Sequence, residues 1–97
     1  MKIIFRATAT ADIKRFRRYY TSIFPEGAKQ AKTHYNQSYA ALLAYPLVGS
    51  ALGDETPLRE LVIPRTHFSF VYYVAGEEII VVRILDARAE RPKKFAI

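Results

Sequence analysis

The chain contains no cysteine and only two histidines, and each scarcity removes a class of chemistry. Without cysteine there is no disulfide framework, no thiolate metal site and no cysteine nucleophile. His34 and His67 lack the close spacing that metal ligands usually show. Glycine-rich phosphate-binding loops and the GxSxG signature are also missing. The sequence therefore predicts no metal and no bound cofactor.

Long apolar segments are missing as well. No run reaches the roughly 20 apolar residues that a membrane-spanning helix needs. The N-terminal segment, MKIIFRATAT, has too short an apolar stretch for a signal peptide. Secreted domains of this size often carry disulfides. We therefore expect a cytoplasmic protein that makes no contact with a membrane.

Acidic residues are few, with nine Asp and Glu against fifteen Lys and Arg, which gives a formal charge of +6. Such an excess favours an acidic partner: nucleic acid, an acidic protein or an assembly that contains nucleic acid. The chain is 51% hydrophobic and 25% charged, which is typical of a globular protein. Its 97 residues suffice for one core, so we expect a single domain over residues 1–97.

The N-terminal half predicts one strand and two helices. Residues 2–7 are rich in β-forming side chains, and Thr8, Thr10 and Asp12 are of the kind that cap helix N-termini. Apolar residues then recur at helical spacing, which predicts helices from about residue 11 to 24 and from about 28 to 45. Because few residues join them, the helices should form an antiparallel hairpin.

The C-terminal half predicts an irregular loop and three strands. Residues 46–57 hold two glycines and two prolines, which indicates an ordered loop. Strands are expected at 58–64, 66–74 and 78–86, the last two joined around Gly76. The order β-α-α-β-β-β predicts a two-layer α+β fold. In it, the N-terminal strand and an antiparallel three-stranded meander lie under the helical hairpin.

The predicted strand 66–74 has two different faces. Its aromatic face should pack on the helices and consists of Phe68, Phe70, Tyr72 and Val74. A two-residue turn at Ala75-Gly76 would place Val71 opposite Ile80, although a slip of one residue would change the pairing. The second face would then carry four apolar residues that no helix covers: Val71, Ile80, Val82 and Ile84. Either a partner lies on this face, or the C-terminal tail or the loop folds over it.

Three segments, together with this order of elements, resemble the RelE/ParE toxin superfamily over nearly the whole chain. They are LREL at 58–61, FSFVYYV at 68–74 and IIVVRILDAR at 79–88. Members of that superfamily are toxins of bacterial type II toxin–antitoxin operons, often labelled plasmid stabilisation proteins. The resemblance implies a helical hairpin on one side of a small sheet. It also implies an antitoxin partner whose C-terminal segment, often acidic, wraps the toxin.

The two branches of this superfamily differ in activity, and the resemblance is closer to the ParE branch, which inhibits DNA gyrase. RelE-like toxins cut messenger RNA on the ribosome. Their pattern implies lysines, an arginine and a C-terminal tyrosine where this chain has Glu60, Val62, Ser69 and Phe95. Because the groups of a nuclease site act together, these departures argue against cleavage. The alternatives are a ribosome-dependent messenger RNA endonuclease and a non-toxic relative that only binds an antitoxin-like protein or DNA.

Cationic residues near the strand ends are the candidate contact residues. Those predicted to touch the target are Arg83, Arg88, Arg91, Lys93 and Lys94. A nuclease would have to rely on Arg88, Arg91 and Lys93. Those predicted to touch the antitoxin are Arg59, Arg65, Val71, Ile80, Val82 and Ile84. For Arg59 and Arg83, the alternative is an internal salt bridge to Glu60, Asp86 or Glu90.

Overall fold

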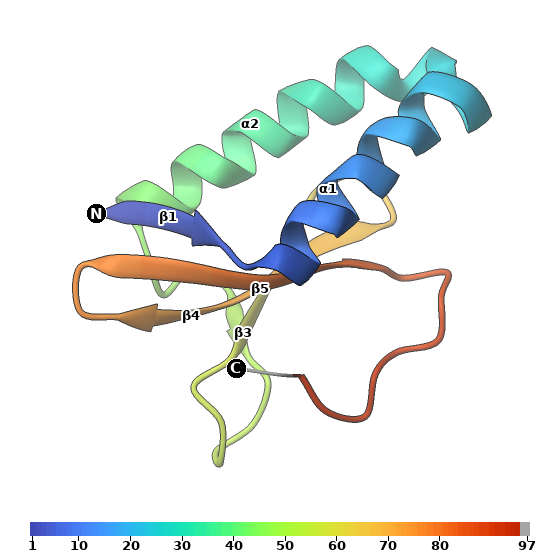
Figure 1. Ribbon diagram of the computed structural model, residues 1–97. Helices are drawn as coiled ribbons and strands as arrows, with labels where there is room; N and C mark the ends of the chain where they lie inside the picture. Colours follow the sequence, from blue (N-terminus) through green and yellow to red (C-terminus); the bar gives the residue numbers. More distant parts are fainter. Residues whose placement is uncertain (96–97) are drawn as a thin grey trace.

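The computed structural model describes residues 1–95, so the last two residues of the expected domain and tail lie outside it. Its elements form two layers, with the helices above the sheet (Figure 1). Within this range, no helix is long and apolar enough to cross a bilayer. The elements in chain order are β1 (Lys2–Phe5), α1 (Ala7–Arg18), η1 (Tyr19–Ile23), η2 (Pro25–Gly27), α2 (Ala28–Ala44), β2 (Ser50–Ala51), β3 (Arg59–Val62), β4 (Phe68–Ala75) and β5 (Glu78–Asp86).

The sheet has the strand order β1-β5-β4-β3-β2. Strands β3, β4 and β5 form the predicted antiparallel meander. Strand β1 pairs with β5 in parallel, so the sheet is mixed. The loop after α2 contributes β2, which pairs with β3 through Ser50 and Ala51. A strand of two residues leaves no periodic signal, which is why the sequence predicted only a loop there.

Helix α1 begins earlier than predicted, at Ala7, and its last turn widens into the π-helix η1. Thr8, Thr10 and Asp12 therefore lie inside the helix, and the prediction that they cap it is wrong. The side chains of Thr8 and Asp12 instead bond the edge of β5, where Thr8 Oγ1 donates to the Val82 carbonyl at 2.8 Å. Because β1 pairs with β5 only as far as Val81, the edge beyond it needs such partners.

The helices cover the face of the sheet that was predicted to pack against them. Phe68, Phe70 and Tyr72 are fully or almost fully buried there. The ring of Phe68 meets that of Phe16 from α1 edge-on, with centroids 5.0 Å apart. The ring of Phe70 packs against Tyr35 from α2 with centroids 5.4 Å apart. One aromatic row on β4 thus holds both helices.

The strand register differs from the predicted one. The turn lies at Gly76-Glu77, with Gly76 at a φ of +59°, and Tyr73 rather than Val71 is paired with Ile80. Further along, a β-bulge opposite Val71 and Tyr72 shifts the register once more. Because an extra residue reverses the inward–outward alternation, Ile84 faces the helices. Its predicted place on the second face is wrong.

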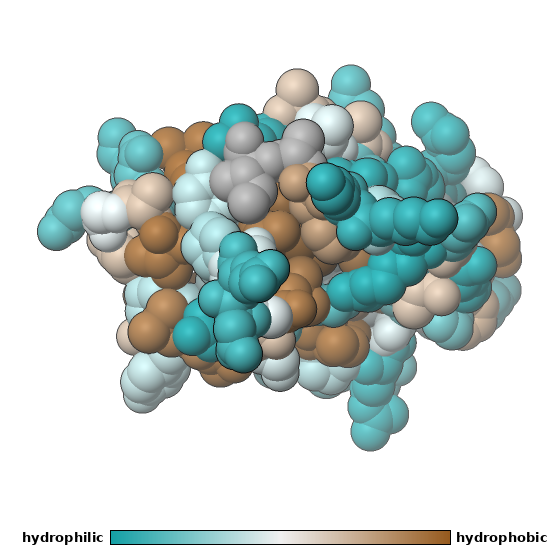
Figure 2. Space-filling model, turned by 90° about the horizontal axis from the view of Figure 1, so that it is seen from below, coloured by the Kyte–Doolittle hydropathy of each residue, from teal (hydrophilic) through white to brown (hydrophobic). Residues whose placement is uncertain are grey.

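The second face of the sheet is covered by the chain itself. Its buried residues are Leu58, Val71, Ile80, Val82 and Leu85. Leu52 from the loop and Phe95 from the C-terminal tail pack against them. Seen from this side in Figure 2, hydrophobic side chains are visible in patches among hydrophilic ones. The expectation of an open apolar face is therefore wrong, and the alternative, that loop and tail fold over it, is confirmed.

Candidate functional site

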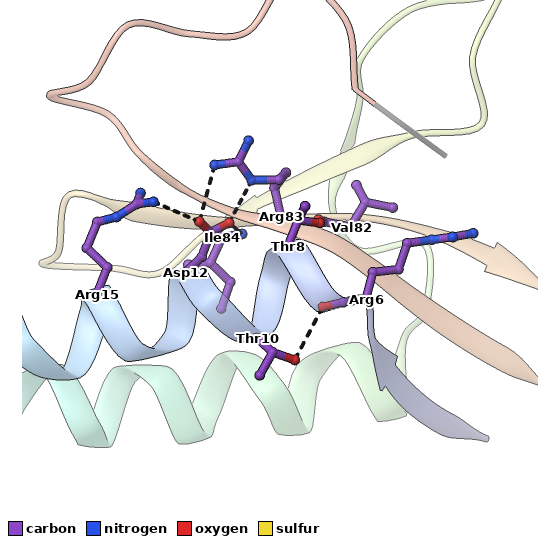
Figure 3. A network of polar contacts seen from close by, with 8 residues as sticks. All are labelled: Arg6, Thr8, Thr10, Asp12, Arg15, Val82, Arg83 and Ile84. Carbon is purple, nitrogen blue, oxygen red and sulfur yellow. Dashed lines mark hydrogen bonds and ion pairs between the residues drawn. The ribbon is translucent and has the colours of Figure 1, made fainter.

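The first feature of the site is a buried carboxylate, that of Asp12, at the edge of β5 (Figure 3). Asp12 is 2% exposed and accepts hydrogen bonds from Arg83 Nε at 2.7 Å and from the backbone N–H of Ile84 at 2.9 Å. Arg15 lies one turn further along α1, and its Nη2 is 3.2 Å from Asp12 Oδ1. The hydrogen bond to Asp12 raises the pKa of Arg83. A buried carboxylate is tolerated here because its oxygens are satisfied.

This network decides between the two expectations for Arg83. Its head group makes an internal salt bridge, as the alternative held, but the partner is Asp12 rather than Glu60, Asp86 or Glu90. The bridge joins α1 to β5 across more than two thirds of the chain. Contact of Arg83 with a target stays a prediction.

The second feature is a cluster around Glu60 on β3. Ser69 Oγ donates to Glu60 Oε2, and Arg91 Nη2 from the tail donates to Glu60 Oε1 at 2.6 Å. Since Glu60 is paired with Val71, Ser69 is its diagonal neighbour on the same face of the sheet. Burial alone would raise the pKa of Glu60, but the hydrogen bonds from Arg91 and Ser69 lower it. The ionised carboxylate fastens the tail to the sheet.

The third feature lies where β5 ends. Arg88 donates to both carboxylate oxygens of Asp86, at 3.0 and 2.7 Å, and this lowers the pKa of Asp86. The guanidinium of Arg88 lies 4.1 Å from the ring centre of Tyr19, which belongs to η1. A cation over an aromatic face is attracted by the ring quadrupole. Arg88 therefore joins the exit of the sheet to the helical layer, with its side chain still 43% exposed.

These features surround a cleft of about 260 Å³ whose charged lining residues are Arg15, Glu60, Arg83, Asp86, Glu90 and Arg91. Each arginine of this lining is held in an ion pair, Arg15 and Arg83 by Asp12 and Arg91 by Glu60. Within residues 1–95, no group of three or more His, Asp or Glu is placed to hold a metal ion. The cleft can therefore offer hydrogen bonds, but it presents little net positive charge to an anion.

Arg59 has a role in the loop after α2. It donates to the carbonyls of Leu47 and Gly49 at 3.2 and 2.8 Å. The Tyr72 hydroxyl accepts from the Gly49 N–H at 2.8 Å, and a Cβ on Gly49 would lie 2.8 Å from that ring. The partners of Arg59 are thus carbonyls, not the acidic residues that the alternative proposed, and the loop is held rigidly.

The remaining predicted contact residues are spread over the molecule. Arg65 is exposed in the turn before β4. Lys93 and Lys94 are exposed on the rim of a second cavity, of about 490 Å³, between the loop and the tail. Val71, Ile80 and Val82 lie beneath that loop and tail, while Ile84 lies under the helices. The six residues predicted for the antitoxin therefore do not form one open surface.

Comparison with known proteins now identifies the family. Residues 3–91 match the model of a family described as the ParE toxin of type II toxin–antitoxin systems, parDE. The chain belongs to this ParE family. The resemblance noted in the sequence is confirmed, including its leaning towards the ParE branch.

Two solved structures are similar to this ParE-family chain. One belongs to the chromosomal ParDE toxin–antitoxin system from P. aeruginosa. It is 29% identical, with a TM-score of 0.64, and the match covers 87% of this chain and 92% of that one. The other, a copper-bound mutant toxin from Helicobacter pylori, is 18% identical, with a TM-score of 0.66 and coverages of 91% and 96%. At that identity the likeness shows the fold alone. A search of curated proteins found no significant match.

Sequence reasoning took Asp12 for a helix-capping residue and missed its central role in this ParE-family chain. A signal was present, because Asp12 lies three residues after Ala9 and four before Phe16, on the buried stripe of α1. A carboxylate on such a stripe must find partners inside the protein. The role of Glu60 was also missed, because it depends on the folded tail and on the pairing of β3 with β4.

Proposed function

We propose that this ParE-family toxin acts by binding to DNA gyrase and is neutralised by a cognate antitoxin. Three properties support binding rather than cleavage: membership of the ParE family, a formal charge of +6 and the state of the cleft at the end of β5. The third property carries the argument because it concerns the place where nuclease groups would be expected.

A nuclease of the RelE type would need free cations to stabilise a developing phosphate charge, and a group that moves a proton. In this chain Glu60 lies at the expected place and accepts hydrogen bonds from both Ser69 and Arg91. The Glu60 carboxylate thus already binds the Arg91 guanidinium and the Ser69 hydroxyl, the two groups that could otherwise contact an RNA substrate. Phe95, in place of a tyrosine, has no hydroxyl to donate and packs against the second face.

The target contact would then be made from the outer side of the tail. Arg88 and Arg91 keep 43% and 52% of their side chains exposed, and Lys93 and Lys94 are exposed beside them. Arg83, with its head group on Asp12, would position β5 rather than reach a partner. Such rim cations steer an acidic partner and set the rate of association.

The antitoxin would contribute an acidic segment. On this chain the contact residues that remain accessible are Arg65, at the turn before β4, and the rim of the cavity between loop and tail. Arg91, Lys93 and Lys94 line that cavity against a single carboxylate, Glu55, which gives the rim a positive balance. An acidic segment of the antitoxin would complement it.

The decisive experiment is to induce the chain alone in bacteria and to follow plasmid supercoiling, the SOS response and messenger RNA integrity together. Loss of supercoiling with intact transcripts is the expected result. Cuts at codon positions with normal supercoiling would contradict the proposal and favour a ribosome-dependent endonuclease. Normal growth with stable protein would also contradict it and would point to a non-toxic relative.

A supercoiling assay with purified gyrase locates the contact. We expect the double variant Lys93→Gln, Lys94→Gln to need about tenfold more toxin for half inhibition, because two rim cations are lost. Lys2→Gln removes an exposed cation from β1 and should leave inhibition unchanged. Equal effects of the two variants would mean that net charge, not the tail, governs the contact.

A further inference from the structure

Two groups of cations on this chain differ in whether carboxylates pair with them. Those of the cleft and the β5 exit are paired with carboxylates, as described above. The second group lies on the helical layer and is named here the hairpin-tip cluster: Lys14, Arg17, Arg18, Lys29 and Lys32. All five are exposed, and within residues 1–95 none of their side chains makes a salt bridge or hydrogen bond.

Chain topology brings this cluster together. The chain reverses through η1 and η2, so the end of α1 lies beside the start of α2 (Figure 1). Arg17 from α1 and Lys32 from α2 line one groove of about 440 Å³. Residues 33–53, by contrast, contain no charged residue at all. The unpaired charge of the helical layer is therefore concentrated at the closed end of the hairpin.

Helix stability does not explain the cluster. Arg17 and Arg18 lie in the last turn of α1, where cations complement the helix dipole. Lys29 lies in the first turn of α2, where a cation opposes the dipole, and that turn contains no acidic residue. Bringing the cations of two helices together adds repulsion between like charges. An arrangement that breaks a local rule without a structural gain indicates a ligand.

We propose that the hairpin-tip cluster binds the phosphate backbone of duplex DNA. The cations come from two helices and are spread along them: Lys14 and Arg18 are one helical turn, about 6 Å, apart. Packed helices lie about 8–10 Å from each other. This distribution fits an extended polyanion rather than a single phosphate group.

The neighbouring side chains fit the same ligand. Gln30 and Asn36 are exposed on α2 and can donate hydrogen bonds to phosphate oxygens. The cluster lies on the flank of a hairpin and not on a helix that projects into a groove. Backbone contacts position a protein on DNA but read no bases, so the binding is independent of sequence.

This inference goes beyond the proposed function and does not depend on it. It concerns the helical layer, whereas the proposed gyrase contact lies on the tail, on the other side of the sheet (Figure 1). Its test contains no gyrase. A failure of one proposal would therefore leave the other standing.

The test measures binding of the purified chain to a labelled DNA duplex of arbitrary sequence, by fluorescence anisotropy between about 50 and 200 mM salt. Five phosphate contacts predict a slope of log K against log salt of about −4.5. The variant Arg17→Gln, Lys32→Gln removes one cation from each side of the groove. It should weaken binding at least about tenfold and reduce the slope by about 2.

The matched control is Lys93→Gln, Lys94→Gln, which lowers the net charge equally but on the tail. It should change DNA affinity less than about threefold. Equal losses in the two variants, or no binding by the unmodified chain, would overturn the proposal. So would polyglutamate that binds more tightly than DNA and loses affinity in the groove variant, because the cluster would then serve an acidic protein. Circular dichroism checks that each variant is folded.

Discussion

The two faces of the sheet are covered by different means. Above it, two helices with their own hydrogen bonds pack on Phe68, Phe70 and Tyr72. Below it, the cover is the loop that contains the two-residue strand β2 and a tail without regular secondary structure, held by Phe95 and by the ion pair between Arg91 and Glu60. The upper cover is a cooperative part of the fold, whereas the lower one depends on a few local contacts.

The two covers should therefore differ in how easily they open. Regions with few buried contacts and exposed hydrogen bonds open with less free energy than core helices and strands. The side chain of Arg91 is 52% exposed, so its ion pair is screened by water and salt. We therefore expect the cover of the lower face to open at a lower free-energy cost than the helical cover.

The strongest test of the comparison uses two adjacent isoleucines of β5. Ile79 faces the helices at 0% exposure, and Ile80 faces the loop and tail at 9%. Ile79→Ala should lower the free energy of unfolding by about 3–4 kcal/mol, and Ile80→Ala by about 1–2 kcal/mol, because the lower cover can relax around the cavity. Urea denaturation measures both. Equal losses would mean that the two covers are equally rigid.

The next largest effect concerns the joint between α1 and β5. Asp12→Ala should cost about 2–3 kcal/mol, because the buried N–H of Ile84 and the half-buried Arg83 lose their acceptor. Arg15→Ala is the control, since Arg15 is about half exposed, and should cost under about 1 kcal/mol. Thermal and urea unfolding of both proteins check this. A small loss in Asp12→Ala would show that the network contributes little.

Removal of the ring on the tail should have a smaller global effect. Phe95→Ala should cost about 1 kcal/mol, because Phe95 is only partly buried, but it should open the lower face. We expect faster tryptic cleavage after Arg88 and Lys94 while the helical layer remains protected. Tyr45→Ala, which removes a ring that is 71% exposed, is the control and should not change the cleavage rate.

The smallest expected effect is a pH dependence of the tail. The pKa of Glu60 is lowered in the folded state, so its ion pair stabilises above the unfolded pKa, near 4.5, and is lost as pH falls through the folded value. Glu60→Gln should therefore expose the tail at neutral pH, and the difference from the unmodified protein should vanish in acid. Amide hydrogen exchange of residues 87–95 in both proteins measures how exposed the tail is at each pH. Equal exchange of the two proteins at neutral pH would contradict this and would assign the fastening to Phe95.

Much of the fold could be predicted from the sequence because apolar residues recur at helical spacing in the helices and at every second position in the strands. The helical stripes ending near Phe24 and Leu43 and the aromatic alternation from Phe68 to Val74 are local patterns. The register of β5 could not be predicted in this way. Its bulge shifts Ile84 to the helix face, and a bulge depends on contacts with a neighbouring strand.

The candidate site was less predictable than the fold. Arg83, Arg88 and Arg91 were found by their charge, but charge does not reveal a partner far away in the sequence. Arg83 is paired with Asp12 on the first helix, and Arg91 with Glu60 on β3. Of these three arginines, only Arg88 is paired with a close neighbour in the chain, Asp86.

By itself, the sequence determined the element order apart from the short strand β2, the aromatic row that faces the helices and the ParE likeness, because these depend on residue type and spacing along the chain. Tertiary structure alone decided which cations are free. It paired those at the end of the sheet with Asp12, Asp86 and Glu60, and it left the hairpin-tip cluster unpaired. The reason is physical: an ion pair requires two groups within a few ångströms, and folding sets that distance for residues far apart in the chain.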